Sequence, residues 1–577
     1  MNSSIVGRIR IVIYSLCLFA LIIIIKLYFI QIVSGDDYKK KADSQYVKPS
    51  NTILKRGTIF FESKDKTRIA GATTKDGFIV SINPSKLQEN SDNIENVYKA
   101  LQQYLPIEKS TFLEKTYKRN DQYEEIGKKI DRETGLAINN LKIPGVVATN
   151  DSWRVYPGGI SISPQVIGLV GSNDKNEVAG RYGLERFYQD VLSKKDNISS
   201  VNFFAELFSD IESTIFNKNK KQGDIVSSID PVVEDYLYKI LEKTKNTWKS
   251  DSIGGIIMDP VTGEIYSMAL LPSFDPNNTK NIDNPKIFSN SLVEDVYEMG
   301  SIIKPLTMAS GIDSGVITPA SNYDDKGFME LDGKKISNYD GKARGVINIQ
   351  EVLIQSLNIG AATIALKVGS EEFSRYFLSF GLGEKTGIDQ PNEQKGIVNN
   401  LLSKRDIEHA TASYGQGIAM SPITTIRSLS ILANGGKLVR PHIIKEIDYD
   451  DGSVEKIDSG NAIQVIKKET SETVTKMLVE VVDKAISKKH PGILIPHFSI
   501  AAKTGTAQIA DSQNGGYYSD RYLHSFFGYF PAYNPRFIVF LYHRYPKGAE
   551  YASETLTEPF IDITKFLINY YEIEPDR

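Results

Sequence analysis

The sequence predicts an α+β protein in which one antiparallel sheet is completed by strands from distant parts of the chain. Two apolar runs separated by a turn predict a hairpin near residue 255, and further strand patterns return only near residue 500. Mostly helical patterns lie between these two sets of strands. Strands at both ends of a domain with helices in the middle favour an antiparallel sheet flanked by helices.

The composition is that of an ordinary globular protein, and it excludes some classes of function. The 577 residues include 24% charged and 10% aromatic residues, and the formal net charge is -3. A nucleic-acid-binding protein would favour a strongly basic domain or stripe, so we expect no nucleic-acid partner. The six histidines show no HExxH or Cys/His spacing. We therefore expect no metal site and no cofactor.

An apolar segment near the N-terminus predicts a transmembrane helix over residues 10–33, after a short tail over residues 1–9. As a helix, residues 11–33 would be about 34 Å long, enough to cross a hydrocarbon core of roughly 30 Å. A cleavable signal peptide would usually have a shorter apolar region of about 7 to 15 residues. Charge does not settle the orientation, because a long following domain translocates largely regardless of flanking charges.

Residues 35–225 form a polar module rich in Lys, Asp, Asn and Tyr. The stretch GFIVSINP predicts a strand, and NIENVYKALQQYL predicts a helix. The stretches RGTIF at 56–60 and GRYGLERFYQDVL at 180–192 combine glycines with charged residues. Such residues usually form turns and solvated surfaces, which is our interpretation of both stretches. We expect scaffold in this module and the active site elsewhere.

The second domain, over residues 226–577, contains the predicted sheet. A helical pattern from 232 to about 245 precedes GGIIMDPVTGEIYSMAL, which predicts a hairpin with a longer loop. The stretches HFSIAAKTGTAQIA and HSFFGYFPAYNPRFIVFLYH predict further strands, with a turn at Asn534 and Pro535.

Ser301 and Lys304 are the first candidates for chemistry. Pro305 is tolerated only near the first turn of a helix, so a helix is predicted to begin near Ser301. Residues three apart on a helix are neighbours. A lysine accepts a proton readily only when burial or a nearby positive charge lowers its pKa, and the flanks of Lys304 are apolar. The same spacing occurs in polar surroundings at Ser63 and Lys66, Ser172 and Lys175, and Ser453 and Lys456.

Taken alone, this window leaves two interpretations open. Serine is a favoured N-cap residue, so Ser301 would cap the helix while Lys304 stays at the surface. In the alternative, the free amides of the helix start stabilise the oxyanion that forms when Ser301 attacks a carbonyl.

Two further motifs favour the chemical interpretation. Ser356 and Asn358 lie in the largely apolar, helical pattern VLIQSLNIGAATIAL, where buried polar groups need partners. The motif KTGT at 503–506 follows FSIAA in a strand pattern, where Gly505 lets another part of the chain approach closely.

The three motifs, in this order, resemble those of the penicillin-binding proteins. The stretch YEMGSIIKP is similar to the YEPGSxxKP of that family, with Met299 in place of the usual proline. TASYGQGIAMSPI at 411–423, LANGGKLVRP at 432–441 and HSFFGYFPA at 524–532 resemble recurring stretches of the class B, monofunctional branch. RGTIF and GRYGLERFYQDVL resemble pieces of that branch's N-terminal pedestal or dimerisation module.

The resemblance implies a serine D,D-transpeptidase that cross-links peptidoglycan stem peptides and is acylated by β-lactams. It also implies the penicillin-binding serine transpeptidase fold, preceded by an elongated pedestal module and one transmembrane helix. Ser301 would attack the carbonyl between two D-alanines, and Lys304 would take the serine proton. Ser356 would pass a proton to the departing D-alanine, and Asn358 would position Lys304 and the substrate amide.

The resemblance assigns the third motif to substrate binding. Lys503 would supply positive potential, and the hydroxyls of Thr504 and Thr506, on either side of Gly505, would bind the terminal carboxylate. The amides of Ser301 and Thr506 would form the oxyanion hole.

The implied place of action is outside the bacterial cytoplasmic membrane, with one membrane span and a polytopic glycan polymerase as partner. The role would be septal or elongation cell-wall synthesis, and the short module and YEMGS look slightly more like the division type. Three alternatives stay open: a D,D-carboxypeptidase or β-lactamase, a β-lactam-binding sensor, and a catalytically weak scaffold of the synthase complex.

Overall fold

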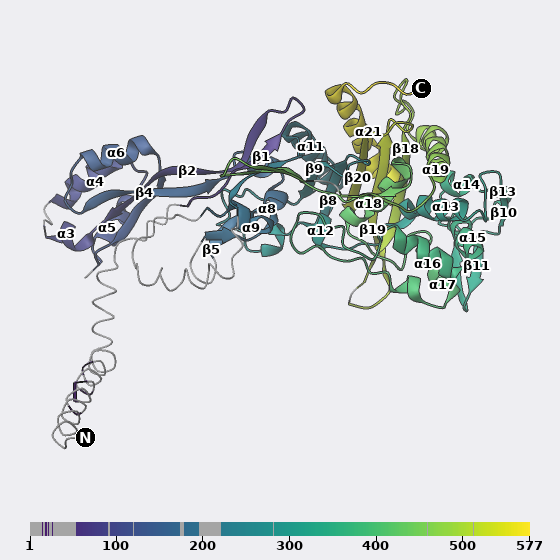
Figure 1. Ribbon diagram of the computed structural model, residues 1–577, viewed down its shortest axis with the longest axis horizontal. Coiled ribbons are helices and arrows are strands. Elements are labelled where there is room, and N and C mark those ends of the chain that lie inside the picture. The colour runs from purple at the N-terminus through teal and green to yellow at the C-terminus, as the bar shows by residue number, and fades with distance from the viewer. Residues whose placement is uncertain are drawn as a thin grey trace, which may run out of the picture. The chain divides into compact units, whose positions relative to one another are not determined.

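A computed structural model gives the structure of the protein (Figure 1). It describes residues 54–89, 93–118, 121–172, 178–194, 221–280, 282–457, 460–511 and 513–577, and five helical positions near the N-terminus: Tyr14, Leu18, Phe19, Leu21 and Lys26. Within this described part of the chain, no helix has the length and apolar character needed to span a membrane. The tail at 1–9 and, apart from those five positions, the anchor at 10–33 lie outside it.

The chain divides into two compact units, of which the first includes residues 76–153 and the second includes residues 55–75 and 154–577. In the first unit, β3 (Glu124–Ile130) and β4 (Val146–Val155) pair with the second half of β2 (Arg68–Ile82). Its core is formed by apolar residues of these strands and of four helices. The helices are α3 (Pro84–Gln88), α4 (Ile94–Gln102), α5 (Lys109–Thr116) and α6 (Arg132–Asn140). The strand and helix predicted for GFIVSINP and NIENVYKALQQYL are therefore confirmed.

The second unit begins with a sheet that joins the N-terminal segments to the larger domain. Its strand order is β16, β15, β7, β1 and then the first half of β2. β1 runs parallel to β7, and β15 runs antiparallel to it. The strands are β1 (Ile59–Glu62), β7 (Gly223–Ser227), β15 (Ile444–Tyr449) and β16 (Val454–Lys456). The predicted boundary between residues 225 and 226 thus falls inside a strand with neighbours on both sides.

The second unit also contains the antiparallel sheet that the sequence predicts. Its five strands have the order β18, β19, β20, β8 and β9, and every neighbouring pair is antiparallel. They are β8 (Ser252–Met258), β9 (Ile265–Leu271), β18 (Ala501–Ala510), β19 (Tyr517–Phe530) and β20 (Phe537–Arg544). Two strands before residue 272 and three after residue 500 share one sheet, which confirms the α+β arrangement.

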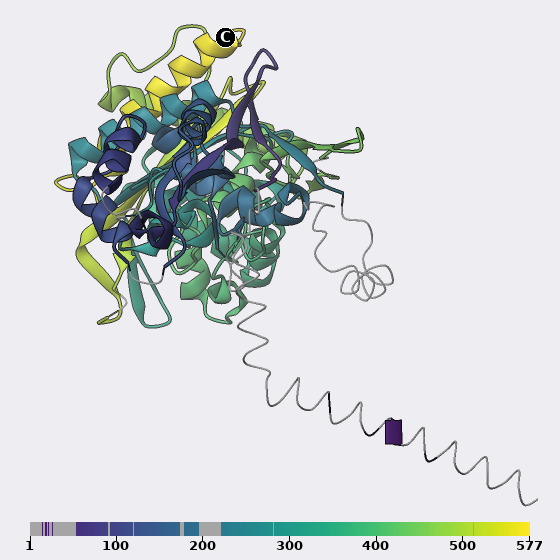
Figure 2. The same cartoon turned by 90° about the vertical axis from the view of Figure 1, so that its left-hand side faces the viewer.

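Helices cover both faces of this sheet (Figure 1 and Figure 2). A Cβ on Gly528 of β19 would lie 2.5 Å from Phe560 of α21, so α21 packs on one face together with its neighbour α11. A Cβ on Gly505 of β18 would lie 3.0 Å from Ile302, so the Ser301 segment packs on the opposite face. The main helices are α11 (Pro231–Trp248), α12 (Ser291–Glu294), α13 (Lys304–Asp313), α14 (Glu351–Ile354), α15 (Asn358–Val368), α16 (Ser370–Ser379), α17 (Asp406–Ala412), α18 (Pro422–Ser430), α19 (Lys468–Val481) and α21 (Ala552–Tyr571).

The solvated-surface interpretation of RGTIF and GRYGLERFYQDVL is wrong for two of their charged residues. Arg56 is 5% exposed and Glu185 is fully buried, and the two form an ion pair. Arg154 donates to the other carboxylate oxygen of Glu185 at 2.7 Å. Two arginines therefore share one buried carboxylate. This contact joins distant segments, so neither stretch predicts it alone.

Candidate active site

The segment that presents Ser301 is a tight helical turn. A 3₁₀ turn over Gly300–Ile303 leads directly into α13, so helical structure begins where the sequence predicts it. Gly300 has φ of 65°, a region that favours glycine. A Cβ at Gly300 would also lie 2.7 Å from the carbonyl oxygen of Thr506. Glycine at this position therefore lets β18 approach the residue next to the nucleophile candidate.

Lys304 lies within hydrogen-bonding distance of the Ser301 hydroxyl. Its Nζ is 2.9 Å from Ser301 Oγ, and it donates to the carbonyl oxygen of Ser356 at 2.6 Å. The side chain is 1% exposed, so the surface interpretation of this lysine is wrong. Burial, and then the positive charge of Lys503, lower the pKa of Lys304 well below that of a free lysine. Neutral Lys304 has a lone pair with which it can accept the serine proton.

Ser356 occupies a break between two helices and not the continuous helix that the apolar pattern predicts. α14 ends at Ile354 and α15 begins at Asn358, and Ser356 has φ of 58°. The break turns both the carbonyl and the hydroxyl of Ser356 toward Lys304, whose Nζ lies 3.2 Å from Ser356 Oγ. Glycine and asparagine are the residues that usually mark a left-handed position in a sequence. Ser356 is neither, so the sequence did not indicate a break inside this apolar pattern.

Lys503 approaches the same hydroxyl from β18. Its Nζ donates to Ser356 Oγ at 3.1 Å and to the Thr504 carbonyl at 2.9 Å. The side chain is 2% exposed, and burial lowers the pKa of Lys503 to about 7, with a smaller effect from Lys489. The Ser356 hydroxyl thus lies between two buried amines from different elements.

The rest of the KTGT motif lies along β18 beside the Ser301 turn. A Cβ on Gly505 would lie 2.7 Å from the Met299 carbonyl oxygen, so glycine permits this close packing. The Thr506 hydroxyl accepts a hydrogen bond from the Ala552 amide at 3.0 Å. Thr504 and Thr506 are half-buried. β18 is the edge strand of the described sheet, so its outer side faces no other strand.

Asn358 lies at the first position of α15 and makes a different contact from the one that the resemblance implies. Its Nδ2 donates to the carbonyl of Ser337, the last residue of β12 (Lys334–Ser337), at 3.0 Å. Among the described residues, no hydrogen bond joins Asn358 to Lys304. The positioning of Lys304 and of the substrate amide by Asn358 stays a prediction.

Met299, in place of the family's usual proline, is accommodated in the core. Its side chain is fully buried, and its carbonyl accepts a hydrogen bond from Ser525 Oγ at 2.8 Å. Ser525 also donates to the Gly505 carbonyl at 3.2 Å, so it joins the Ser301 segment to β18. Sequence reasoning missed this role, because HSFFGYFPA showed only a family resemblance and no reactive pattern.

The cluster has the parts of an acyl-transfer site. A serine lies beside a buried amine of lowered pKa, which is the arrangement that activates a weak nucleophile. A second serine bridges that amine to a second lysine, and a strand edge runs alongside. The described residues contain no group of His, Cys, Asp and Glu side chains that could hold a metal ion.

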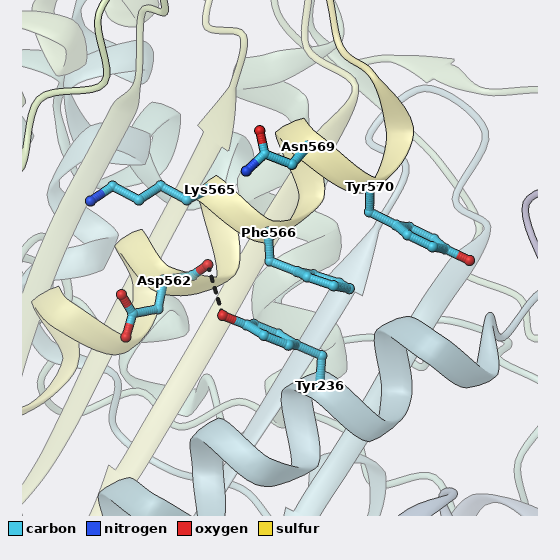
Figure 3. Close-up of a pocket in the computed structure, with 6 residues that line it drawn as sticks. All are labelled: Tyr236, Asp562, Lys565, Phe566, Asn569 and Tyr570. Carbon is cyan, nitrogen blue, oxygen red and sulfur yellow. Dashed lines mark hydrogen bonds between the residues drawn. The ribbon is translucent and has the colours of Figure 1, made fainter.

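A shallow groove elsewhere in the domain contains none of these motif residues. It lies between α11 and α21 and has a volume of about 500 Å³ (Figure 3). The rings of Tyr236 and Phe566 stack there with centroids 3.9 Å apart. Its lining residues are Tyr236, Asp562, Lys565, Phe566, Asn569 and Tyr570. The groove contains no serine and no buried lysine, so the Ser301 cluster is the candidate active site.

Comparison with known protein families decides the identity of this fold and site. The profile of the penicillin binding protein transpeptidase domain matches residues 253–565, more than half of the chain. The chain belongs to the penicillin-binding protein transpeptidase family. The profile of the penicillin-binding protein dimerisation domain matches residues 55–227, so this penicillin-binding protein also has the N-terminal module of the class B branch.

Curated relatives of this penicillin-binding protein extend over most of its length. The stage V sporulation protein D of Bacillus subtilis is 29% identical over 559 residues, which cover 94% of this chain and 82% of the relative. The peptidoglycan D,D-transpeptidase FtsI of Buchnera aphidicola is 28% identical over 577 residues, covering 97% of this chain and 94% of the relative. The resemblance inferred from the motifs is confirmed.

Solved structures of other penicillin-binding proteins share the fold. Penicillin binding protein 2X of Streptococcus thermophilus has a TM-score of 0.72 at 19% identity, covering 90% of this chain and 80% of that chain. Penicillin binding protein 3 of Mycobacterium tuberculosis, solved in complex with aztreonam, has a TM-score of 0.68 at 21% identity, covering 91% of this chain and 98% of that chain.

Proposed function

We propose that this penicillin-binding protein cross-links peptidoglycan stem peptides by D,D-transpeptidation through an acyl-enzyme on Ser301. The observation that carries the proposal is that the buried Lys304 amine, whose pKa is lowered by burial and by the charge of Lys503, lies 2.9 Å from the Ser301 hydroxyl. The family membership and relatives named peptidoglycan D,D-transpeptidases support the same reaction.

In the first step, Ser301 Oγ attacks the carbonyl carbon between two D-alanines while Lys304 Nζ takes the hydroxyl proton. The amides of Ser301 and Thr506 bind the oxyanion, a contribution of about 3 to 4 kcal/mol per donor in comparable sites. The proximity of Thr506 to Gly300 supports this pairing, because it brings β18 next to the nucleophile turn.

The departing D-alanine then needs a proton. Ser356 Oγ lies 3.2 Å from Lys304 Nζ and 3.1 Å from Lys503 Nζ, so its hydroxyl can relay a proton from the lysines to the leaving amine. Lys503, Thr504 and Thr506 bind the terminal carboxylate of the substrate. An amine of a neighbouring stem peptide resolves the acyl-enzyme, and a β-lactam acylates the same serine.

The proposed setting is the outer side of the bacterial cytoplasmic membrane. Residues 10–33 form the single span, residues 1–9 the cytoplasmic tail, residues 35–225 the pedestal and residues 226–577 the transpeptidase domain. The substrate supports this orientation, because peptidoglycan lies outside that membrane. A polytopic glycan polymerase in the membrane supplies the strands to be cross-linked.

The first experiment is intact-mass analysis of the detergent-solubilised full chain after incubation with a penicillin. We expect one stable adduct on the wild type and none on Ser301→Ala. Loss of the drug without a lasting adduct would favour hydrolysis, as in a β-lactamase. A folded wild type that does not react would favour the scaffold role and overturn the proposal.

A septal role is the finer part of the proposal, supported by the division-type features of the sequence and by the FtsI relative. Depletion of the protein from its host is expected to block septation while growth in length continues. Rounded cells that still divide would instead indicate a role in elongation.

A further inference from the structure

Glu298 lies three residues before Ser301 and has no part in the chemistry proposed above. Its carboxylate accepts hydrogen bonds from two other segments of the chain. The Tyr517 hydroxyl lies 3.0 Å from both Oε1 and Oε2, and the Gly417 amide lies 3.0 Å from Oε1. One side chain therefore joins the segment that carries the nucleophile to two elements that surround it.

The first of these elements is the outer end of the β18–β19 hairpin. Tyr517 is the first residue of β19, and it pairs with Ala510, the last residue of β18. The pairing is irregular between Gln508 and Ala510. β18 has a described strand on one side only, so the sheet supports this end of the hairpin weakly. Tyr517 is itself 43% exposed, yet its hydroxyl is held by a carboxylate.

The second element is the turn over residues 413–417, which follows α17. The Gly300 amide donates to the Gly415 carbonyl at 3.1 Å, and a Cβ on Gly415 would lie 2.3 Å from the Gly300 carbonyl oxygen. The turn is thus fixed to the nucleophile segment by Glu298 and by the backbone of Gly300. Its Tyr414 is buried, and burial together with the charge of Glu298 raises the pKa of Tyr414.

The electrostatics keep Tyr517 a hydrogen-bond donor. Burial, and then the charge of Glu298, raise the pKa of Tyr517, so its phenol stays protonated. Burial raises the pKa of Glu298, while the hydrogen bonds from Tyr517 and Gly417 oppose that shift. Hydrogen bonds to a carboxylate are stronger than those between neutral groups, which suits a contact that fixes one element against another.

We propose that Glu298 is a positioning residue for acylation, which holds the β18–β19 hairpin through Tyr517 at the distance from Ser301 that the reaction requires. The inference rests on the proposed acyl transfer at Ser301. The proposed substrate-binding motif KTGT lies on β18, the strand that ends at Ala510. A shift of that strand moves the substrate carbonyl away from Ser301 Oγ, and a displacement of about 1 Å can cost a factor of about 100 in rate.

The test compares Tyr517→Phe with Tyr518→Phe in the detergent-solubilised full chain. Tyr518 is the next residue, and the centroid of its ring lies 4.1 Å from the guanidinium carbon of Arg521 on the same strand. With a fluorescent penicillin, we expect the limiting acylation rate of Tyr517→Phe to fall about tenfold, because one charge-assisted hydrogen bond is lost. The rate of Tyr518→Phe is expected to stay within about twofold of wild type, since this substitution leaves the bonds between Tyr517 and Glu298 in place.

A second readout separates positioning from general stability. Because Tyr517 is 43% exposed and lies at the end of a strand, the melting temperature of Tyr517→Phe is expected to stay near that of wild type, while amide hydrogen exchange of residues 507–510 becomes faster. Glu298→Gln keeps a carbonyl acceptor and is expected to restore part of the rate lost in Glu298→Ala. If Glu298→Ala does not fold, the comparison of Tyr517→Phe with Tyr518→Phe still tests the positioning role.

The outcomes distinguish this inference from the proposed function. A wild type that forms no adduct on Ser301 would overturn both. A wild type that is acylated, with Tyr517→Phe equally fast and equally protected from exchange, would overturn the positioning role alone. A parallel loss of rate and melting temperature in Tyr517→Phe would assign Glu298 to stability only.

Discussion

Two groups of buried basic side chains in the second unit have different surroundings. At the active site, Lys304 and Lys503 lie within reach of serine hydroxyls and backbone carbonyls, with no described carboxylate bonded to either. Near the N-terminal segments, Arg56 and Arg154 share the carboxylate of Glu185. Burial without an anion lowers the pKa of a lysine, so it gives up its proton more readily, whereas a guanidinium stays charged. The lysines of the active site can therefore include a base, whereas the two arginines and Glu185 form a structural link between segments of the chain.

The largest expected effect comes from replacing the base Lys304 with a side chain that is always charged. In Lys304→Arg the guanidinium cannot accept the Ser301 proton, so the acylation rate should fall by about a thousandfold, within the range for loss of a general base. The measurement is penicillin acylation by rapid mixing. Lys489→Arg, which changes a more distant lysine in the same way, serves as the control. Retention of more than a tenth of the rate would show that Lys304 is not the base.

Next in size is the removal of the shared carboxylate. Glu185→Gln leaves two buried arginines without an anion, and breaking a buried ion pair costs about 3 to 5 kcal/mol. Chemical unfolding would measure the loss, and acylation of the remaining folded protein should be unchanged. The control is Glu446→Gln, which removes a partner of the partly exposed Arg68 and should cost less than about 1 kcal/mol. Equal effects of the two substitutions would contradict the comparison.

The smallest of these effects is a pH dependence of acylation. Below the lowered pKa of Lys304 the amine is protonated and cannot act as a base, so the rate should rise as the pH increases through that pKa. Above about 7, free Lys503 loses its proton and its attraction for the substrate carboxylate, so the rate should fall. The profile of kcat/KM against pH reports these groups. Lys503→Arg should flatten the alkaline limb, and an unchanged limb would assign it to another group.

The sequence predicted the features that depend on local pattern. The hairpin of β8 and β9, the strands β18 to β20 and the start of α13 follow from the spacing of apolar residues, glycines and prolines. The helix break at Ser356 could not be predicted, because its carbonyl and hydroxyl are held by Lys304, 52 residues away. The Arg56 and Glu185 pair spans 129 residues, and the pattern around each gave no sign of the other.

The motif residues were identified by order and context, but their geometry was not. Lys304 and Lys503 were expected near one another, yet the sequence did not show that the Ser356 hydroxyl lies between them. Glu298 lies in the stretch YEMGSIIKP, which showed a family resemblance but gave no sign of the partners of this carboxylate. Its partners, Gly417 and Tyr517, lie 119 and 219 residues further along the chain.

The open edge of β18 limits which substitutions can weaken the binding of an inhibitor. A ligand that pairs with this edge is recognised by main-chain groups, and no substitution removes a backbone N–H other than one to proline. Any substitution other than one to proline therefore leaves that backbone contact in place. A substitution that shifts the strand can still weaken the contact, through residues that support the strand from behind. Ser525, which bonds to both Gly505 and Met299, occupies such a position.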